Sequence, residues 1–77
     1  MDAAAPAATI DLSGLKCPLP VLRTKKALAG LAEGERLLVI ATDPDTMKDI
    51  PAFAKLAGCR LHAAERDGDR FRFVLER

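Results

Sequence analysis

The chain has 77 residues, of which 49% are hydrophobic, and its 12 Lys and Arg against 11 Asp and Glu give a net charge of +1. A chain of this length buries only about 60% of the surface that it exposes when unfolded, so it forms one small domain without a deep pocket for multi-step catalysis. The composition argues against disorder, the balanced charge against nucleic-acid binding, and the lack of an apolar run of about 20 residues against a membrane span.

A leader and a short strand are the first predicted segments. Residues 1–8 are rich in alanine, and Asp2 stands where a secretory signal needs positive charge. We therefore expect a flexible leader over residues 1–8, followed by a single domain over residues 9–77. Thr9–Leu12 alternates polar and apolar residues, which predicts a strand that ends at the turn signal Ser13-Gly14.

The next segment has the pattern of an amphipathic helix. Four positions share one sector at helical spacing: Val21, Thr24, Leu28 and Leu31. Pro18 fits the first helical position, where its fixed φ suits the helix, and this would make Cys17 the N-cap. Gly34 lies in the region where the helix should stop.

A second strand and a second helix follow. Arg36–Thr42 is apolar on both parities, which predicts a central strand. After the turn at residues 42–45, one face of a helical pattern carries Met47, Ile50, Phe53, Ala54 and Ala57. Because proline is tolerated in a helix's first turn, Pro51 predicts that the main helix begins near Asp49, with Asp43–Lys48 as a looser lead-in. Gly58 is well placed to end this helix.

The last two alternating runs, separated by Asp67-Gly68, predict a β-hairpin. Their apolar positions are Cys59, Leu61 and Ala63 in the first run and Phe71, Phe73 and Leu75 in the second. The βαβαββ order predicts an α/β (α+β) two-layer sandwich, with a mixed four-stranded sheet and both helices on one face. The uncovered face would carry Arg60, His62, Arg70 and Arg72, a polar surface that suits a monomer.

Cys17 is the main candidate for a functional residue. A helix start carries partial positive charge and unpaired N–H groups, so we expect a lowered thiol pKa at Cys17. Pro18 and Pro20 stiffen the chain and shape the site, and they leave the N–H groups of Leu19 and Val21 as the donors that can face the sulfur. The alternative is that Cys17 is a small buried hydrophobic residue.

Basic and apolar residues around Cys17 predict a docking face for partner proteins. They are Lys16, Leu19, Leu22, Arg23 and Lys26. Interfaces commonly combine cations with exposed apolar side chains. The alternative is that these charges simply solvate the outer face of a surface helix.

The remaining cysteine and histidine chemistry is limited. Two cysteines in a small chain indicate a cytoplasmic protein with free thiols rather than a secreted disulfide scaffold. The absence of a Cys-x-x-Cys motif excludes a dithiol cycle within one motif, and Cys17, Cys59 and His62 lack zinc-finger spacing, so we expect no metal. Cys59 is predicted to pack at the core and His62 to face solvent. A nucleophile–base pair of Cys17 and His62 stays open.

Several motifs together resemble the TusA/SirA family of bacterial sulfur carrier proteins. They are Asp11, Gly14-Leu15-x-Cys17-Pro18-x-Pro20-Val21-Leu22, Thr24-Lys25-Lys26-Ala27-Leu28, Thr42-Asp43-Pro44 and Asp49-Ile50-Pro51-x-Phe53. The resemblance covers nearly everything after the leader and implies the same two-layer sandwich. Some relatives carry a second cysteine where this chain has Ala54, so we expect Cys17 to act alone.

The resemblance implies that Cys17 accepts sulfane sulfur from a cysteine desulfurase or a rhodanese-like donor, carries it as a persulfide, and passes it to an acceptor protein. Such a carrier works with partner enzymes, without independent turnover and without a cofactor beyond the covalent persulfide. Its pathway would be tRNA 2-thiouridine synthesis, sulfur oxidation or molybdenum-cofactor synthesis. The Asp43-Pro44 and Asp49-Ile50-Pro51 segments are expected to be mainly structural. The alternative function is a regulatory or adaptor module in which Cys17 senses oxidants.

Overall fold

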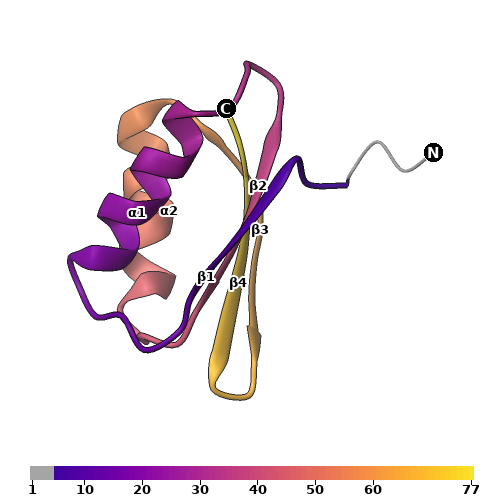
Figure 1. The fold of residues 1–77 in the computed structure, drawn as a ribbon. Coiled ribbons are helices and arrows are strands. Elements are labelled where there is room, and N and C mark those ends of the chain that lie inside the picture. The colour runs from indigo at the N-terminus through magenta and orange to yellow at the C-terminus, as the bar shows by residue number, and fades with distance from the viewer. Residues whose placement is uncertain (1–4) are drawn as a thin grey trace.

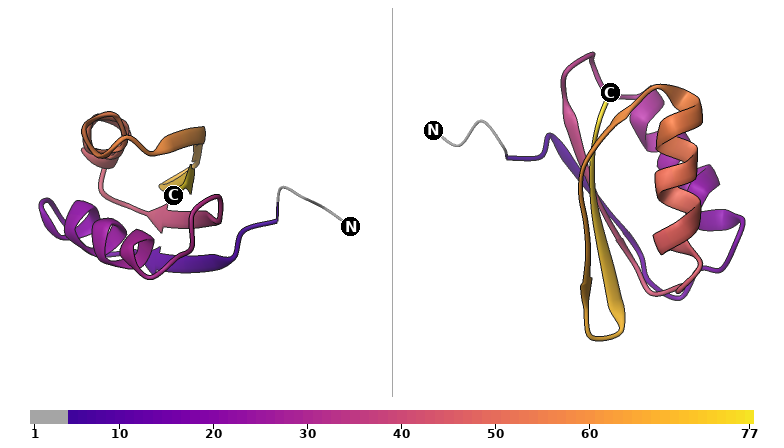
Figure 2. Two further views of the ribbon diagram at one scale, coloured as in Figure 1. Left: turned by 90° about the horizontal axis from the view of Figure 1, so that it is seen from above. Right: turned by 180° about the vertical axis from the view of Figure 1, so that it is seen from behind.

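The computed structural model describes residues 5–77, which form a four-stranded sheet with two helices packed on one face (Figure 1). The elements are β1 (Ala8–Leu12), α1 (Leu19–Ala29), β2 (Arg36–Ala41), α2 (Thr46–Ala57), β3 (Arg60–Asp67) and β4 (Arg70–Glu76). The sheet order is β1-β2-β4-β3; β1 and β2 are parallel, and the other pairs are antiparallel. Figure 2 shows that both helices lie on the same side of the sheet. The predicted βαβαββ sandwich is confirmed.

The core lies between the sheet and the two helices. Because successive strand residues point to opposite faces, each central strand gives every second side chain to the core. The fully or nearly fully buried hydrophobic residues are Leu12, Leu28, Leu37, Val39, Ala41, Ile50, Ala54, Phe71, Phe73 and Leu75. Most of them come from β2 and β4, the two central strands, so the fold depends chiefly on this pair. Of residues 5–77, no helix combines the length and the apolar character that crossing a membrane requires.

β3 departs from the predicted alternation at a β-bulge. The register with β4 shifts between Leu61 and Ala63, which makes His62 the extra residue. One extra residue exchanges the two faces for every residue after it. The prediction that Ala63 shares the core face with Leu61 is therefore wrong. Arg66 lies on the core side instead, with its guanidinium 6.0 Å from the centre of the Phe71 ring.

The C-terminal end of the helix differs from the prediction at α1 but not at α2. α1 ends at Ala29, with Gly30 as its C-cap, so Leu31 and Gly34 lie beyond the helix. Leu31 still packs against the core, which explains why its spacing matched the helical pattern. Gly58 ends α2 as predicted, with a φ of 73° in the left-handed region that only glycine adopts at little cost.

α2 begins at Thr46 rather than near Asp49, so the predicted lead-in is wrong from Thr46 onward. The reason is a set of hydrogen bonds around Asp43. The N–H and hydroxyl groups of Thr46 donate to the Asp43 carbonyl at 3.0 and 2.6 Å, and the Asp45 N–H donates to the Asp43 carboxylate at 3.2 Å. These bonds form the first turn early, and Pro51 is accommodated inside the helix.

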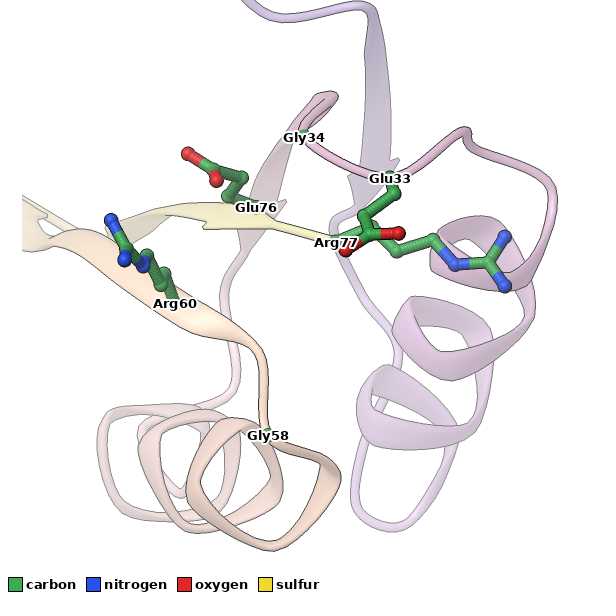
Figure 3. Close-up of a pocket in the computed structure, with 6 residues that line it drawn as sticks. All are labelled: Glu33, Gly34, Gly58, Arg60, Glu76 and Arg77. Atoms are coloured by element: carbon green, nitrogen blue, oxygen red, sulfur yellow. The ribbon is translucent and has the colours of Figure 1, made fainter.

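Arg77 connects the end of β4 to the end of α1. Its guanidinium donates hydrogen bonds to the carbonyl of Ala29 at 3.1 Å and to that of Leu31. Its backbone N–H donates to the Glu35 carbonyl at 2.9 Å. Figure 3 shows the Arg77 side chain extending over the end of α1 at the edge of a polar pocket. Because the last carbonyls of a helix lack intrahelical partners, Arg77 stabilises this end of α1.

Arg77→Ala is expected to lower the free energy of unfolding by about 1 kcal/mol, because carbonyls at the end of α1 lose their hydrogen bonds from a charged donor. Urea unfolding followed by far-UV circular dichroism measures the change. Arg72→Ala is the control, since Arg72 contacts only the exposed Asp67, at 3.4 Å, among the ion pairs of residues 5–77. An equal loss in both variants would contradict the capping role.

Candidate functional site

Cys17 lies in the loop between β1 and α1, at the edge of the sheet where the parallel strands β1 and β2 both end. The residue is exposed, so the alternative of a buried hydrophobic cysteine is wrong. Two hydrogen bonds tie its loop to the loop after β2. The Gly14 N–H donates to the Thr42 hydroxyl at 2.8 Å, and the Cys17 N–H donates to the Asp43 carboxylate at 2.8 Å. These bonds fix the backbone that carries the sulfur.

The start of α1 differs from the prediction. Pro18 is the N-cap and no side chain caps the helix, so the prediction that Cys17 is the N-cap is wrong. The Leu19 N–H donates to the Lys16 carbonyl at 2.9 Å and does not serve the sulfur. Pro18 lines a groove together with Cys17, whereas Pro20 is fully buried and helps to anchor α1.

A shallow groove of about 340 Å³ runs from Cys17 along the two helices. Its lining residues are Cys17, Pro18, Val21, Asp49, Ala52, Phe53 and Leu56. A second groove of about 400 Å³ shares three of these residues and extends along the helices, lined by Val21, Leu22, Lys25, Phe53, Leu56 and Ala57. We call these two together the helix groove. Leu56 is 90% exposed and Leu22 54% exposed, so the helix groove presents large apolar side chains to solvent.

The carboxylates around Cys17 hold the pKa of its thiol above the ordinary value. The largest cause is the Asp49 carboxylate, which lines the same groove as the thiol and favours its protonated form. Partial loss of hydration acts in the same direction, as do the negative charges of Asp49, Asp45 and Asp43. The expectation of a lowered pKa is therefore wrong, because the sulfur meets the carboxylates that precede and begin α2.

The residues predicted to form a docking face are divided between two places. Leu22 borders the helix groove, and Leu19 is 43% exposed at the start of α1. Arg23 and Lys26 instead line a separate groove between α1 and β1. Lys16 is exposed beside Cys17 in the loop.

Sequence reasoning did not assign Asp49, Phe53 and Leu56 to the site. Phe53 was placed on the apolar face of the second helix, and Asp49 was treated as structural. The chain order held a signal for them. Both helices follow parallel strands, so their first turns must meet at one edge of the sheet. The start of the second helix therefore had to lie near Cys17.

His62 and Cys59 are placed away from the helix groove. The His62 ring nitrogen Nε2 lies 2.8 Å from the Glu76 carboxylate, where a hydrogen bond joins β3 to β4 on the open side of the sheet. The structure therefore does not bring His62 together with Cys17. Cys59 is half-buried and packs against the core, as predicted. In the described part of the chain, no group of three or more His, Cys, Asp or Glu side chains is arranged to hold a metal ion.

Comparison with known proteins agrees with the fold and with the exposed cysteine. The family model described as sulfurtransferase TusA matches residues 8–77. The sulfur carrier protein TusA of Allochromatium vinosum is 47% identical over 68 residues, which cover 88% of this chain and 90% of that protein. The crystal structure of the SirA-like protein from Desulfitobacterium hafniense has a TM-score of 0.78 and 31% identity, covering 90% of this chain and 95% of that one. With its fold, motifs and relatives in agreement, the chain belongs to the TusA/SirA-like family of sulfur carrier proteins.

Proposed function

We propose that Cys17 carries sulfane sulfur as a persulfide between two partner proteins. The donor is a cysteine desulfurase or a rhodanese-like protein, and the acceptor is a protein with a reactive cysteine. The observation that supports this proposal is an exposed thiol at the end of an open apolar groove. An open groove can receive a segment of another protein, and a shallow one gives little enclosure for a small substrate.

The chemistry needs only exchange at sulfur. The Cys17 thiolate attacks the outer sulfur of the donor persulfide, the new S–S bond forms, and the S–S bond of the donor breaks. The donor cysteine leaves as a thiolate and gains the proton that Cys17 lost. The acceptor thiolate then attacks the outer sulfur of loaded Cys17 in the same way. No net oxidation occurs, so the carrier requires partner enzymes but no cofactor.

Loading tests this function directly. The protein is incubated with a cysteine desulfurase and cysteine, and its intact mass is compared before and after reduction. We expect a reducible gain of one sulfur atom, which peptide mapping assigns to Cys17. The loaded protein is then mixed with an acceptor protein, and labelled sulfur should move to it. A wild-type protein that gains no sulfur would contradict the proposal.

A regulatory or adaptor module is the second candidate, because an exposed cysteine beside an apolar groove would also suit a redox-sensitive binding surface. This candidate requires partner binding that changes when Cys17 is oxidised, without transfer of sulfur to an acceptor thiol. The labelled-sulfur experiment separates the two functions. The pathway that joins the donor and the acceptor is tRNA thiolation, sulfur oxidation or molybdenum-cofactor synthesis. We place the carrier in the cytoplasm, where the reducing conditions keep thiols free.

Leu56→Asp is expected to lower the rate of loading from a protein donor by at least about tenfold, because it places a charge where the donor needs apolar contact. Loading by inorganic polysulfide should fall much less, since this small donor needs no apolar contact with the helix groove and feels only the added charge. Leu56 is 90% exposed, so its replacement leaves the core intact. The two loading rates are measured by intact mass at successive times.

The matched control for this prediction is Thr9→Asp. It adds the same charge at an exposed position of β1, whose side chain points away from the helices because its neighbours Ala8 and Ile10 pack against the core. It should load like wild type from both donors. Equal loading of Leu56→Asp and wild type by the protein donor would show that the helix groove does not dock that donor.

A further inference from the structure

Asp49 has a distinct position relative to the sulfur of Cys17. Of the seven residues that line the groove around Cys17, only Cys17 and Asp49 carry ionisable side chains, and the others are apolar. The two come from different segments, the loop before α1 and the first turn of α2. None of the ion pairs formed among residues 5–77 involves Asp49. Its carboxylate is therefore available to the thiol.

The other carboxylates nearby are less directly placed. Asp43 already accepts hydrogen bonds from the backbone N–H groups of Cys17 and Asp45, at 2.8 and 3.2 Å. Asp45 lies outside the groove lining and acts on the thiol through its charge alone. On the other side, the first turn of α1 contributes no acidic residue, and Lys16 precedes Cys17 in the loop.

We propose that Asp49 is a positioning residue that holds the proton on the empty Cys17 thiol and so makes the free carrier a weak nucleophile. The consequence for loading rests on the proposed function. A thiolate reacts with persulfides and electrophiles, whereas a thiol does not. The free carrier thus resists small sulfur donors and oxidants, and its loading is restricted to donor proteins that remove the thiol proton in the complex.

The raised pKa of the Cys17 thiol supports this role, because Asp49 is the largest of its causes. A carboxylate that accepts a hydrogen bond from an S–H group stabilises the thiol, and its negative charge destabilises the thiolate. The charge disappears when the carboxylate becomes an amide, and the neutral amide oxygen is a weaker acceptor than a carboxylate. Asp49 is partly exposed and lies outside the hydrophobic core, so this replacement changes the site without removing a core residue.

The test measures thiol reactivity in a Cys59→Ser background, so that Cys17 is the one cysteine that can react. The rate of alkylation of Cys17 by iodoacetamide is measured between about pH 6 and pH 10, the range in which thiols titrate. Asp49→Asn should move the profile to lower pH and raise the rate at neutral pH roughly tenfold, the scale on which one nearby charge changes a thiolate population. Asp49→Glu should restore part of the wild-type profile, and Asp45→Asn should give a smaller change. Thermal unfolding shows that each variant is folded.

Loading by inorganic polysulfide is the second readout. The Cys17 thiolate attacks a terminal sulfur, one S–S bond of the polysulfide breaks, and a polysulfide shorter by one sulfur leaves with the thiol proton. Asp49→Asn should load roughly tenfold faster than the matched Asp49 protein, in proportion to its thiolate. An unchanged alkylation profile in Asp49→Asn, or a change as large in Asp45→Asn, would overturn the assignment. A Cys17 that no donor can load would instead contradict the carrier function, while the alkylation profiles would still decide the role of Asp49.

Discussion

Replacement of Cys17 by serine is expected to abolish sulfur loading from every donor. A serine hydroxyl has no thiolate to attack a persulfide and forms no S–S bond, so the loss should be complete rather than partial. Cys17 is also the only exposed cysteine of the two in the chain. The measurement is intact mass after incubation with a cysteine desulfurase and cysteine, with reduction to prove that the added sulfur is a persulfide.

Cys59→Ser is the matched control for that experiment. Cys59 is half-buried against the core and lies outside the helix groove, so this variant should still load. Cys17→Ser should keep its free energy of unfolding within about 0.5 kcal/mol of wild type, because an exposed side chain away from the core has little effect on stability. Sulfur found on Cys17→Ser in the amount found on wild type would place the carrier site elsewhere.

The largest loss of stability is expected from Phe73→Ala. Phe73 is fully buried at the middle of β4, between β2 and β3. Replacing a buried phenylalanine by alanine costs about 3–5 kcal/mol through lost apolar contact and the cavity that remains. A domain of this size has a total free energy of unfolding of about 4–12 kcal/mol. The variant should therefore be strongly destabilised or unfolded, as measured by urea unfolding with far-UV circular dichroism.

Val74→Ala tests whether burial, rather than the strand itself, is responsible. Val74 follows Phe73 directly but points to the open side of the sheet, where it is partly exposed. We expect a loss of about 1 kcal/mol in this variant, because a partly exposed side chain leaves no enclosed cavity when it is shortened. Similar losses at both positions would contradict the assignment of the core to the helix side.

The fold could be predicted from the sequence because its main signals are local or follow from chain order. The alternation around Phe71, Phe73 and Leu75 is a property of one strand, and the crossover through α1 makes β1 and β2 parallel. The bulge at His62 could not be predicted, since no residue there differs from those of a regular strand. The early start of α2 depends on hydrogen bonds around Asp43 that no spacing rule describes.

The site could be predicted in part. Cys17 stood out because of its prolines and its place before a helix, and the structure exposes it. The direction of its pKa shift could not be predicted from local sequence, because the groups responsible are Asp43, Asp45 and Asp49, more than 25 residues away in the chain. A helix start alone suggests a stabilised thiolate, but the tertiary structure brings carboxylates to the same sulfur, and they have the opposite effect.

The hydrogen bond from the Cys17 N–H to the Asp43 carboxylate fixes the position of the sulfur relative to the sheet. The bond joins the loop after β1 to the loop after β2, and these two strands are parallel neighbours. The backbone of Cys17 is therefore attached to the edge of the sheet as well as to α1. The loop that carries the sulfur is therefore held at two points, by the Thr42 hydroxyl and by the Asp43 carboxylate. In the carrier that we propose, this attachment would keep the sulfur in one place while proteins of different shape contact the helix groove.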